Sequence, residues 1–193
     1  MQIKITKKFA VKEPVQPVWG FLSDPRKVAT CVPGAQIIEA LDERRYAGTV
    51  NVKVGPVVTR YKGELVIERL DHENYELELV GKGHDVKGKG AASMKMIGKL
   101  RALPQGGTEV TGTSEISVSG IMSQFGSRVI EEVSHQIFEQ FSQNLQKNLE
   151  GVGGPAPGER PAPSLRAIPI LATASKKAVL NFFRRIRGRS EKQ

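Results

Sequence analysis

The sequence is poor in residues that carry metal binding, disulfide bonding and nucleophilic catalysis. It contains one cysteine and three histidines in 193 residues. The single Cys31 excludes an intramolecular disulfide, fits a reducing compartment and is interpreted as a small buried residue. His72, His84 and His135 have no second histidine, cysteine or carboxylate at a ligand spacing, so we predict no metal site. No constellation of catalytic residues is recognisable, and we expect no enzyme.

Long apolar runs are also missing. No stretch approaches the roughly 20 residues that a membrane-spanning helix needs. The first eleven residues alternate polar and apolar side chains, unlike the apolar region of a signal peptide. We therefore expect a cytoplasmic protein whose membrane contact is peripheral. The glycine- and lysine-rich segment 81–90 lacks the spacing of a phosphate-binding loop and is interpreted as a flexible turn between strands.

Positive charge is concentrated at the C-terminal end. Residues 151–193 contain nine Lys/Arg and two acidic residues, which accounts for +7 of the formal net charge of +9. This distribution is typical of a nearly neutral body held next to an anionic partner. Eight of the thirteen residues in 151–163 are Gly or Pro, so no regular element persists there. We assign residues 1–150 to a folded domain, 151–163 to a linker and 164–193 to a basic tail.

The folded domain is dominated by alternating apolar and polar side chains, the pattern of half-buried strands. Each strand has one apolar and one polar face, which predicts an antiparallel sheet covered on one side. The predicted strands are 2–11, 36–42, 45–54, 57–69, 74–82, 91–102 and 107–119.

Helical patterns interrupt the strands. A short helix is predicted at 14–22, and Asp24 begins a second one that ends near Thr30. Residues 121–150 read as one long helix, with Gly126 as a candidate bend. The order predicts an α+β helix-grip architecture, in which a curved antiparallel seven-stranded sheet grips the long C-terminal helix.

An apolar cavity between sheet and helix is favoured by composition. Aromatic residues are only 6% of the chain, and glycines recur inside the strands. A filled core is the alternative, and periodicity cannot separate the two. The entrance is predicted near Met122 and Phe125. The predicted wall residues are Val52, Val54, Tyr61, Leu77, Leu79, Met94, Met96, Val118, Met122, Phe125 and Val129.

The tail has the pattern of an interfacial helix. On a helical wheel, the large apolar residues of 171–187 form one stripe with basic residues beside it, and Leu180 is the one exception on the polar side. We expect binding to an anionic membrane surface, with packing on a partner protein as the alternative. Nucleic acid is disfavoured because a phosphate backbone cannot use the apolar stripe. The predicted membrane-binding residues are Leu171, Lys176, Lys177, Val179, Phe182, Phe183, Arg184, Arg185, Ile186 and Arg187.

Residues 9–36 (FAVKEPVQPVWGFLSDPRKVATCVPGAQ) resemble the opening of proteins of the carbon monoxide dehydrogenase G-subunit family, which belongs to the START-like (SRPBCC, helix-grip) superfamily. The likeness extends over residues 1–150. The segments that carry it are 18–22 (VWGFL), 24–25 (DP), 31–34 (CVPG), 52–56 (VKVGP), 61–63 (YKG), 107–110 (GTEV) and Phe138-x-x-Phe141.

The resemblance implies a non-catalytic accessory role with a molybdenum-containing carbon monoxide dehydrogenase or a related hydroxylase. Proteins of this family are associated with recruiting the enzyme to the cytoplasmic face of the cell membrane. No metal or covalent cofactor is implied. An apolar pocket, a membrane tether and a redox partner together lead us to expect that the cavity carries a respiratory quinone, menaquinone or ubiquinone.

Two other functions stay open. A cyclase- or hydratase-like enzyme would need an ionisable group on the apolar faces, which offer mainly Tyr46, Tyr61, Tyr75 and Lys7. A carboxylate or histidine projecting into the cavity would favour it. A pure assembly factor would have its interior filled.

Overall fold

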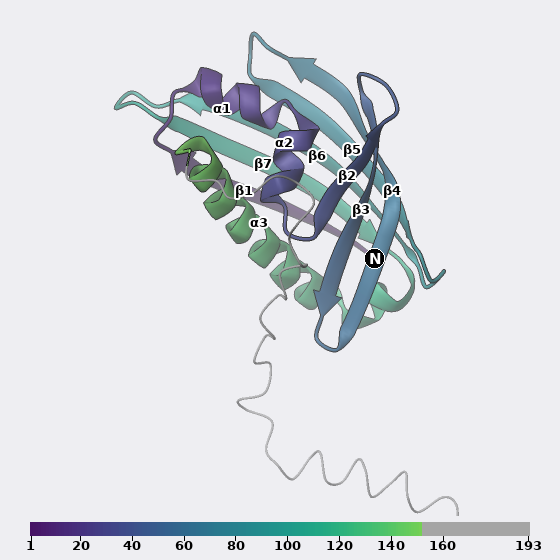
Figure 1. Cartoon of the computed structure of the whole chain (residues 1–193). Coiled ribbons are helices and arrows are strands. Elements are labelled where there is room, and N and C mark those ends of the chain that lie inside the picture. The colour runs from purple at the N-terminus through teal and green to yellow at the C-terminus, as the bar shows by residue number, and fades with distance from the viewer. Residues whose placement is uncertain (152–193) are drawn as a thin grey trace, which may run out of the picture. The chain divides into compact units, whose positions relative to one another are not determined.

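A computed structural model describes residues 1–151, which form a seven-stranded antiparallel sheet with helices on one side (Figure 1). The sheet order is β1-β7-β6-β5-β4-β3-β2, so the N-terminal strand pairs with the last one. The strands are β1 (Gln2–Val11), β2 (Ala35–Ala40), β3 (Arg45–Val54), β4 (Val57–Asp71), β5 (Glu76–Asp85), β6 (Ala91–Ala102) and β7 (Thr108–Val118).

All seven predicted strands exist, because the alternation that identified them reflects one face against helices and one against solvent. The extents of β3 and β6 match the prediction. The boundary of β5 was wrong: the strand continues through Asp85, so 81–85 is not part of a flexible turn.

Two short helices follow β1. Helix α1 (Val15–Leu22) begins after Pro14. Helix α2 (Pro25–Cys31) has Asp24 at its N-cap, where the carboxylate accepts a hydrogen bond from the Arg26 amide at 2.9 Å. Both helices were predicted from these proline and aspartate positions. Cys31 is fully buried at the end of α2, as expected.

The single long helix predicted for 121–150 is wrong. A 3-10 helix, η1 (Gly120–Phe125), ends at Gly126, and α3 (Ser127–Leu149) begins after it. Gly126 has φ of 81°, a left-handed conformation that a continuous helix cannot contain. The bend expected at Gly126 is therefore a break that re-aims η1 relative to α3.

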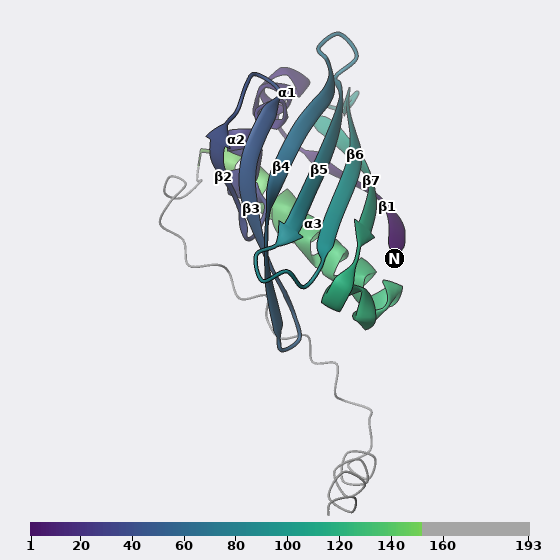
Figure 2. The same ribbon diagram turned by 90° about the vertical axis from the view of Figure 1, so that its right-hand side faces the viewer.

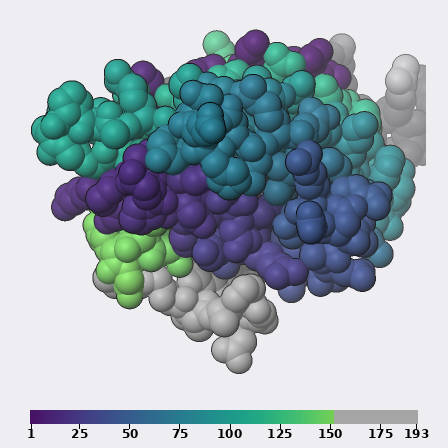
Figure 3. Space-filling view, turned by 90° about the horizontal axis from the view of Figure 1, so that it is seen from above, coloured from purple at the N-terminus to yellow at the C-terminus, as the bar shows by residue number. Residues whose placement is uncertain are grey.

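Helix α3 crosses one face of the sheet diagonally, with η1 at its lower end and α1 near its upper end (Figure 2). The view from above shows the purple N-terminal segment between the green end of α3 and the blue and teal strands (Figure 3). None of the helices within residues 1–151 is long and apolar enough to span a membrane. Residues 152–193, with nearly all of the predicted linker and the predicted tail, lie outside the described residues.

Candidate ligand-binding face of the sheet

The face of the sheet that carries α3, called here the inner face, is identified by aromatic contacts. Phe9 of β1 packs edge-on against Phe138 and Phe141 of α3, with ring centroids 5.5 and 6.2 Å apart. Side chains alternate along a strand, so Ile3, Ile5, Lys7 and Val11 share this face with Phe9. The antiparallel registers extend this assignment to the other six strands.

Buried residues between the inner face and the helices form two separate clusters. The α1 cluster gathers under α1 and the end of α3, and the η1 cluster gathers under η1 and the start of α3. The α1 cluster contains Val11, Val15, Val18, Trp19, Ile67, Leu77, Leu79, Leu100 and Val110. The η1 cluster contains Val54, Tyr61, Met122 and Val133, with half-buried neighbours that include Val52, Val118, Phe125 and Val129.

Glycines on the inner face are aligned at two levels of the sheet, one beside Tyr61 and one beside Leu77. Gly48, Gly63 and Gly83 are aligned across β3, β4 and β5, and Gly98 is aligned with Gly112 across β6 and β7. A β-carbon added to Gly112 would meet no atom within 4 Å. A β-carbon added to Gly98 would instead meet the Leu77 side chain at 3.2 Å, so among these five glycines Gly112 is the one with unoccupied space beside it.

Ten of the eleven predicted wall residues are divided between the two clusters. Leu77, Leu79 and Met96 belong to the α1 cluster. Met94 belongs to neither and lies half-buried opposite Gly81, at the middle of the inner face. The seven others, Val52, Val54, Tyr61, Val118, Met122, Phe125 and Val129, all lie in the η1 cluster.

Tyr61 and Asp85 bring polar groups to the η1 cluster. They are directly opposed on β4 and β5, and both are buried, at 8% and 6% exposure. Burial, and to a smaller degree the Asp85 carboxylate, raise the pKa of the Tyr61 phenol. Within residues 1–151 the Tyr61 hydroxyl has no hydrogen-bond partner. The pair is the most polar feature of this part of the inner face.

The Asp85 side chain is held by its own turn and leaves one oxygen unused. Its Oδ2 accepts a hydrogen bond from the Lys89 amide at 3.1 Å. Its Oδ1 is buried and has no hydrogen-bond partner among the described residues. A buried carboxylate oxygen in this state carries a desolvation cost that a donor would remove.

The turn after Asp85 is tied to η1. The Ile121 amide donates to the Lys89 carbonyl at 3.0 Å, and the Ala91 amide donates to Ser119 Oγ at 3.0 Å. Gly120 has φ of 73° and lies so close to the Lys89 carbonyl that a β-carbon would clash. Asp85 and Met122 are therefore fixed at the same end of the inner face.

The other polar side chains predicted for the apolar faces have different roles. Lys7 is half-buried and lies opposite Gly112. The Tyr46 hydroxyl donates to the Glu43 carbonyl at 3.3 Å, and Tyr75 packs edge-on against Trp19 at the α1 end. Among these side chains, Tyr61 is the one that shares the η1 end with a carboxylate.

Asp85 was missed by the sequence interpretation. The run Leu77-x-Leu79-x-Gly81-x-Gly83-x-Asp85 keeps a period of two, but two of its members lack side chains. The apolar signal therefore fades four residues before the strand ends. Continuing the period of two from Leu79 to position 85 would have placed the Asp85 carboxylate on the inner face.

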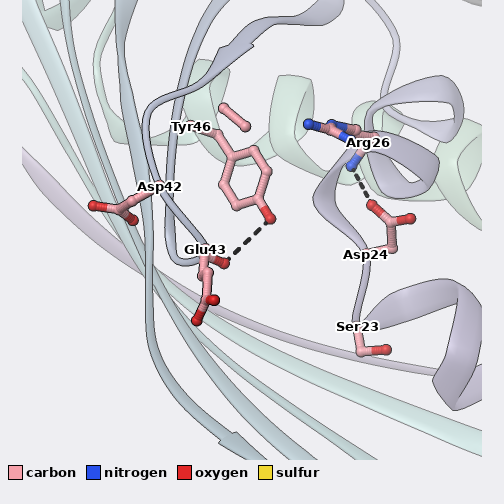
Figure 4. A pocket seen from close by; sticks show the side chains of 7 residues that line it. Ser23, Asp24, Arg26, Asp42, Glu43 and Tyr46 are labelled. Carbon is pink, nitrogen blue, oxygen red and sulfur yellow. Dashed lines mark hydrogen bonds between the residues drawn. The ribbon is translucent and has the colours of Figure 1, made fainter.

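A polar pocket of about 550 Å³ lies elsewhere, between the α1–α2 junction and the β2–β3 turn (Figure 4). None of the predicted wall residues lines it. Its acidic groups have structural tasks: Asp24 caps α2, and hydrogen bonds from Arg45 and the Arg44 amide hold the pKa of Asp42 below its ordinary range. Its lining residues are Ser23, Asp24, Arg26, Ala40, Asp42, Glu43 and Tyr46.

The histidines are dispersed in the described part of the chain. His72 accepts a hydrogen bond from Trp19 Nε1 at 2.9 Å, which joins the β4–β5 turn to α1. Within residues 1–151 no His, Cys, Asp and Glu side chains gather in a group that could hold a metal ion.

Residues 8–150 match the family of the carbon monoxide dehydrogenase G subunit, CoxG. No curated protein matches the chain. The resemblance expected from the short sequence segments is thereby confirmed over the folded domain.

Solved structures share the fold. A conserved protein from Geobacillus kaustophilus has a TM-score of 0.70 at 20% identity, covering 79% of this chain and 98% of its own. The ZhuI aromatase/cyclase from Streptomyces sp. R1128 has 0.58 at 13%, covering 78% and 94%. A START superfamily protein from Mycobacterium smegmatis has 0.55 at 9%, covering 77% and 98%. These likenesses establish a START-like helix-grip fold.

Proposed function

This chain belongs to the CoxG family, the family of the carbon monoxide dehydrogenase G subunit, and from that membership we propose a non-catalytic accessory role. The protein binds an apolar ligand on the inner face and recruits a molybdenum-containing carbon monoxide dehydrogenase, or a related hydroxylase, to the cytoplasmic face of the cell membrane. The observations that support the ligand-binding part are the apolar inner face with its two clusters of buried residues and the position of Gly112, where an added β-carbon would meet no atom within 4 Å.

The ligand in this proposal is a respiratory quinone, menaquinone or ubiquinone. Its ring and isoprenoid chain are apolar and match the aliphatic and methionine side chains of the inner face. The η1 cluster is the proposed opening, because Met122 and Phe125 belong to the short helix that covers this end. The ligand would pass between membrane and enzyme, carrying electrons from carbon monoxide to the respiratory chain.

Membrane attachment is assigned to the tail. The proposal rests on the sequence pattern of 164–193, where an apolar stripe with Phe182 and Phe183 lies beside basic residues. Apolar burial and attraction to anionic headgroups each contribute, and the ordering of the segment opposes them. The expected result is reversible docking on the membrane surface.

The test is isolation of the full-length chain from native membranes under mild detergent. Organic extraction and mass spectrometry then identify small molecules, and protein mass spectrometry identifies the partner. The proposal expects a quinone and a molybdenum hydroxylase. A chain that retains no apolar molecule from native membranes contradicts the ligand part and favours a pure assembly factor.

A second function is favoured by Asp85. A buried carboxylate on the inner face, beside a tyrosine, is the ionisable group that a cyclase- or hydratase-like enzyme would need. One structural neighbour is described as an aromatase/cyclase, which at 13% identity is a likeness of fold. Recovery of a chemically altered apolar compound after incubation with the purified protein, and its absence with Asp85→Asn, would favour this function over transport.

A further inference from the structure

We propose that Asp85 and Tyr61 form the polar end of the ligand site and select ligands that end in a hydroxyl group. If the cargo is a quinone, the site then prefers the reduced hydroquinone to the oxidised quinone. The inference rests on the proposed ligand-binding function. It adds a preference for ligands with a terminal hydroxyl group, which the fold alone does not indicate.

The Asp85 side chain has the properties of a receptor for a hydrogen-bond donor. It is 6% exposed, it projects from the inner face, and its Oδ2 is occupied by the Lys89 amide. Its Oδ1 is buried without a partner among the described residues. Asp71, which caps the β4–β5 turn, uses both oxygens: Oδ1 accepts from the Glu73 and Asn74 amides and Oδ2 from the Asn74 side chain. Asp85 differs because its Oδ1 is left without such a donor.

Tyr61 supplies the complementary group. It lies opposite Asp85, packs in the η1 cluster with Val54 and Met122, and its hydroxyl is available to donate or accept. Gly83, next to Asp85 on the inner face, lies beside the Tyr61 β-carbon and adds no side chain of its own. A ring that enters between the two polar groups therefore meets one fixed acceptor and one adaptable hydroxyl.

The two redox forms of a quinone differ in hydrogen bonding. A quinone carbonyl can only accept, so it can bond to the Tyr61 hydroxyl but leaves Asp85 Oδ1 facing another acceptor. A hydroquinone hydroxyl donates to Asp85 Oδ1 and can accept from Tyr61. Charge-assisted hydrogen bonds of this kind are stronger than neutral ones, so reduction of the ligand strengthens binding.

The expected preference is about tenfold. The measurable consequence is a shift in the midpoint potential of a quinone probe, because tighter binding of the reduced form makes reduction easier. For a two-electron couple, a tenfold preference raises the potential by about 30 mV. The probe is 2-methyl-1,4-naphthoquinone, titrated spectroelectrochemically under anaerobic conditions with excess full-length protein, against the free probe.

Asp85→Asn is the informative variant. The amide oxygen retains an acceptor for the Lys89 amide, so the turn is kept, while an NH2 donor replaces the free carboxylate oxygen. The upward shift should disappear or reverse. Asp71→Asn is the matched control, since Asp71 accepts amide hydrogen bonds in an exposed turn and should leave the shift unchanged. Thermal unfolding of both variants checks that the fold is preserved.

The outcomes separate this inference from the function it rests on. Equilibrium dialysis of the oxidised probe, run in parallel, reports binding itself. Binding without an upward shift in the wild type, or an equal shift in Asp85→Asn, overturns the role of Asp85 and leaves ligand binding intact. Failure of both the oxidised and the reduced probe to bind contradicts the proposed function and this inference together.

Discussion

Tyr61 and Asp85 face each other across β4 and β5, and this neighbourhood raises the pKa of the tyrosine. Burial is the larger cause, because the phenolate loses more hydration than the phenol when it is surrounded by apolar groups. The carboxylate adds repulsion to the phenolate. The raised pKa of Tyr61 can therefore be measured without any ligand.

Tyr61 should ionise at a higher pH than a free phenol, whose pKa is about 10. The unfolded chain then loses this proton first as the pH rises, so the contribution of Tyr61 to stability is present below about pH 10 and is lost above it. Tyrosinate absorbance followed against pH should show a late transition that Tyr61→Phe removes. In Asp85→Asn the transition should move only partly toward its ordinary position, since burial remains.

The unfolding free energy gives an independent check on the same pair. Between neutral pH and alkaline pH, wild type should lose more stability than Tyr61→Phe, which has no phenol to ionise. An identical alkaline loss in both proteins, with no late transition in wild type, would show that Tyr61 is solvated.

The sequence could predict the strands because their outer face is polar and their inner face apolar, and it failed where glycine replaces an informative side chain. Gly81 and Gly83 interrupt the apolar pattern of β5, so the last part of this strand was not predicted. Gly126 separates two helices, although the apolar pattern continues through it. The buried residues form two clusters because of distances between strands, which the spacing of residues along the sequence does not encode. For this reason the sequence predicted one set of wall residues, whereas the structure places ten of them in two clusters.

Gly112→Leu tests whether the open space on the inner face is where ligands bind. The new side chain would extend into space that no atom occupies within 4 Å of its β-carbon. The unfolding free energy should change by less than about 1 kcal/mol, the range of substitutions that create no clash. Binding of a long-chain menaquinone in equilibrium dialysis should fall about tenfold or more, because its isoprenoid chain and the leucine compete for one volume. Binding of 2-methyl-1,4-naphthoquinone, whose ring is placed at Asp85, should stay at the wild-type level, since Gly112 is level with Leu77, eight residues along β5 from Asp85.

Gly20→Leu is the control for this variant. Gly20 lies in α1, exposed, and its added β-carbon would also meet no atom within 4 Å. Binding should stay at the wild-type level. Unchanged menaquinone binding in Gly112→Leu would place the isoprenoid chain elsewhere on the protein.

Gly63→Ala should be strongly destabilising although it adds a single methyl group. The β-carbon would lie 1.9 Å from the Lys82 carbonyl oxygen, so β4 and β5 must separate to admit it. We expect a loss of more than about 2 kcal/mol in urea unfolding, as for other substitutions that strain the backbone. Gly81→Ala is the matched control, with its nearest contact the Leu65 Cδ1 at 3.9 Å. Equal stability of the two variants would contradict the close approach of β4 and β5 at Gly63.

Phe182→Glu combined with Phe183→Glu should release the full-length protein from vesicles that contain anionic phospholipid. Each phenylalanine contributes about 1.5–3 kcal/mol when buried, and each added carboxylate removes roughly 1 kcal/mol near an anionic surface. Together these terms amount to about 5–8 kcal/mol, which corresponds to a loss of affinity of at least about a thousandfold, measured by co-sedimentation. Ile38→Glu with Leu41→Glu is the control, because it adds the same charge at exposed apolar positions of the folded domain. If both double variants lose binding equally, net charge and not the tail holds the protein on the membrane. If neither loses binding, the tail is not the anchor and the folded domain must carry the attachment.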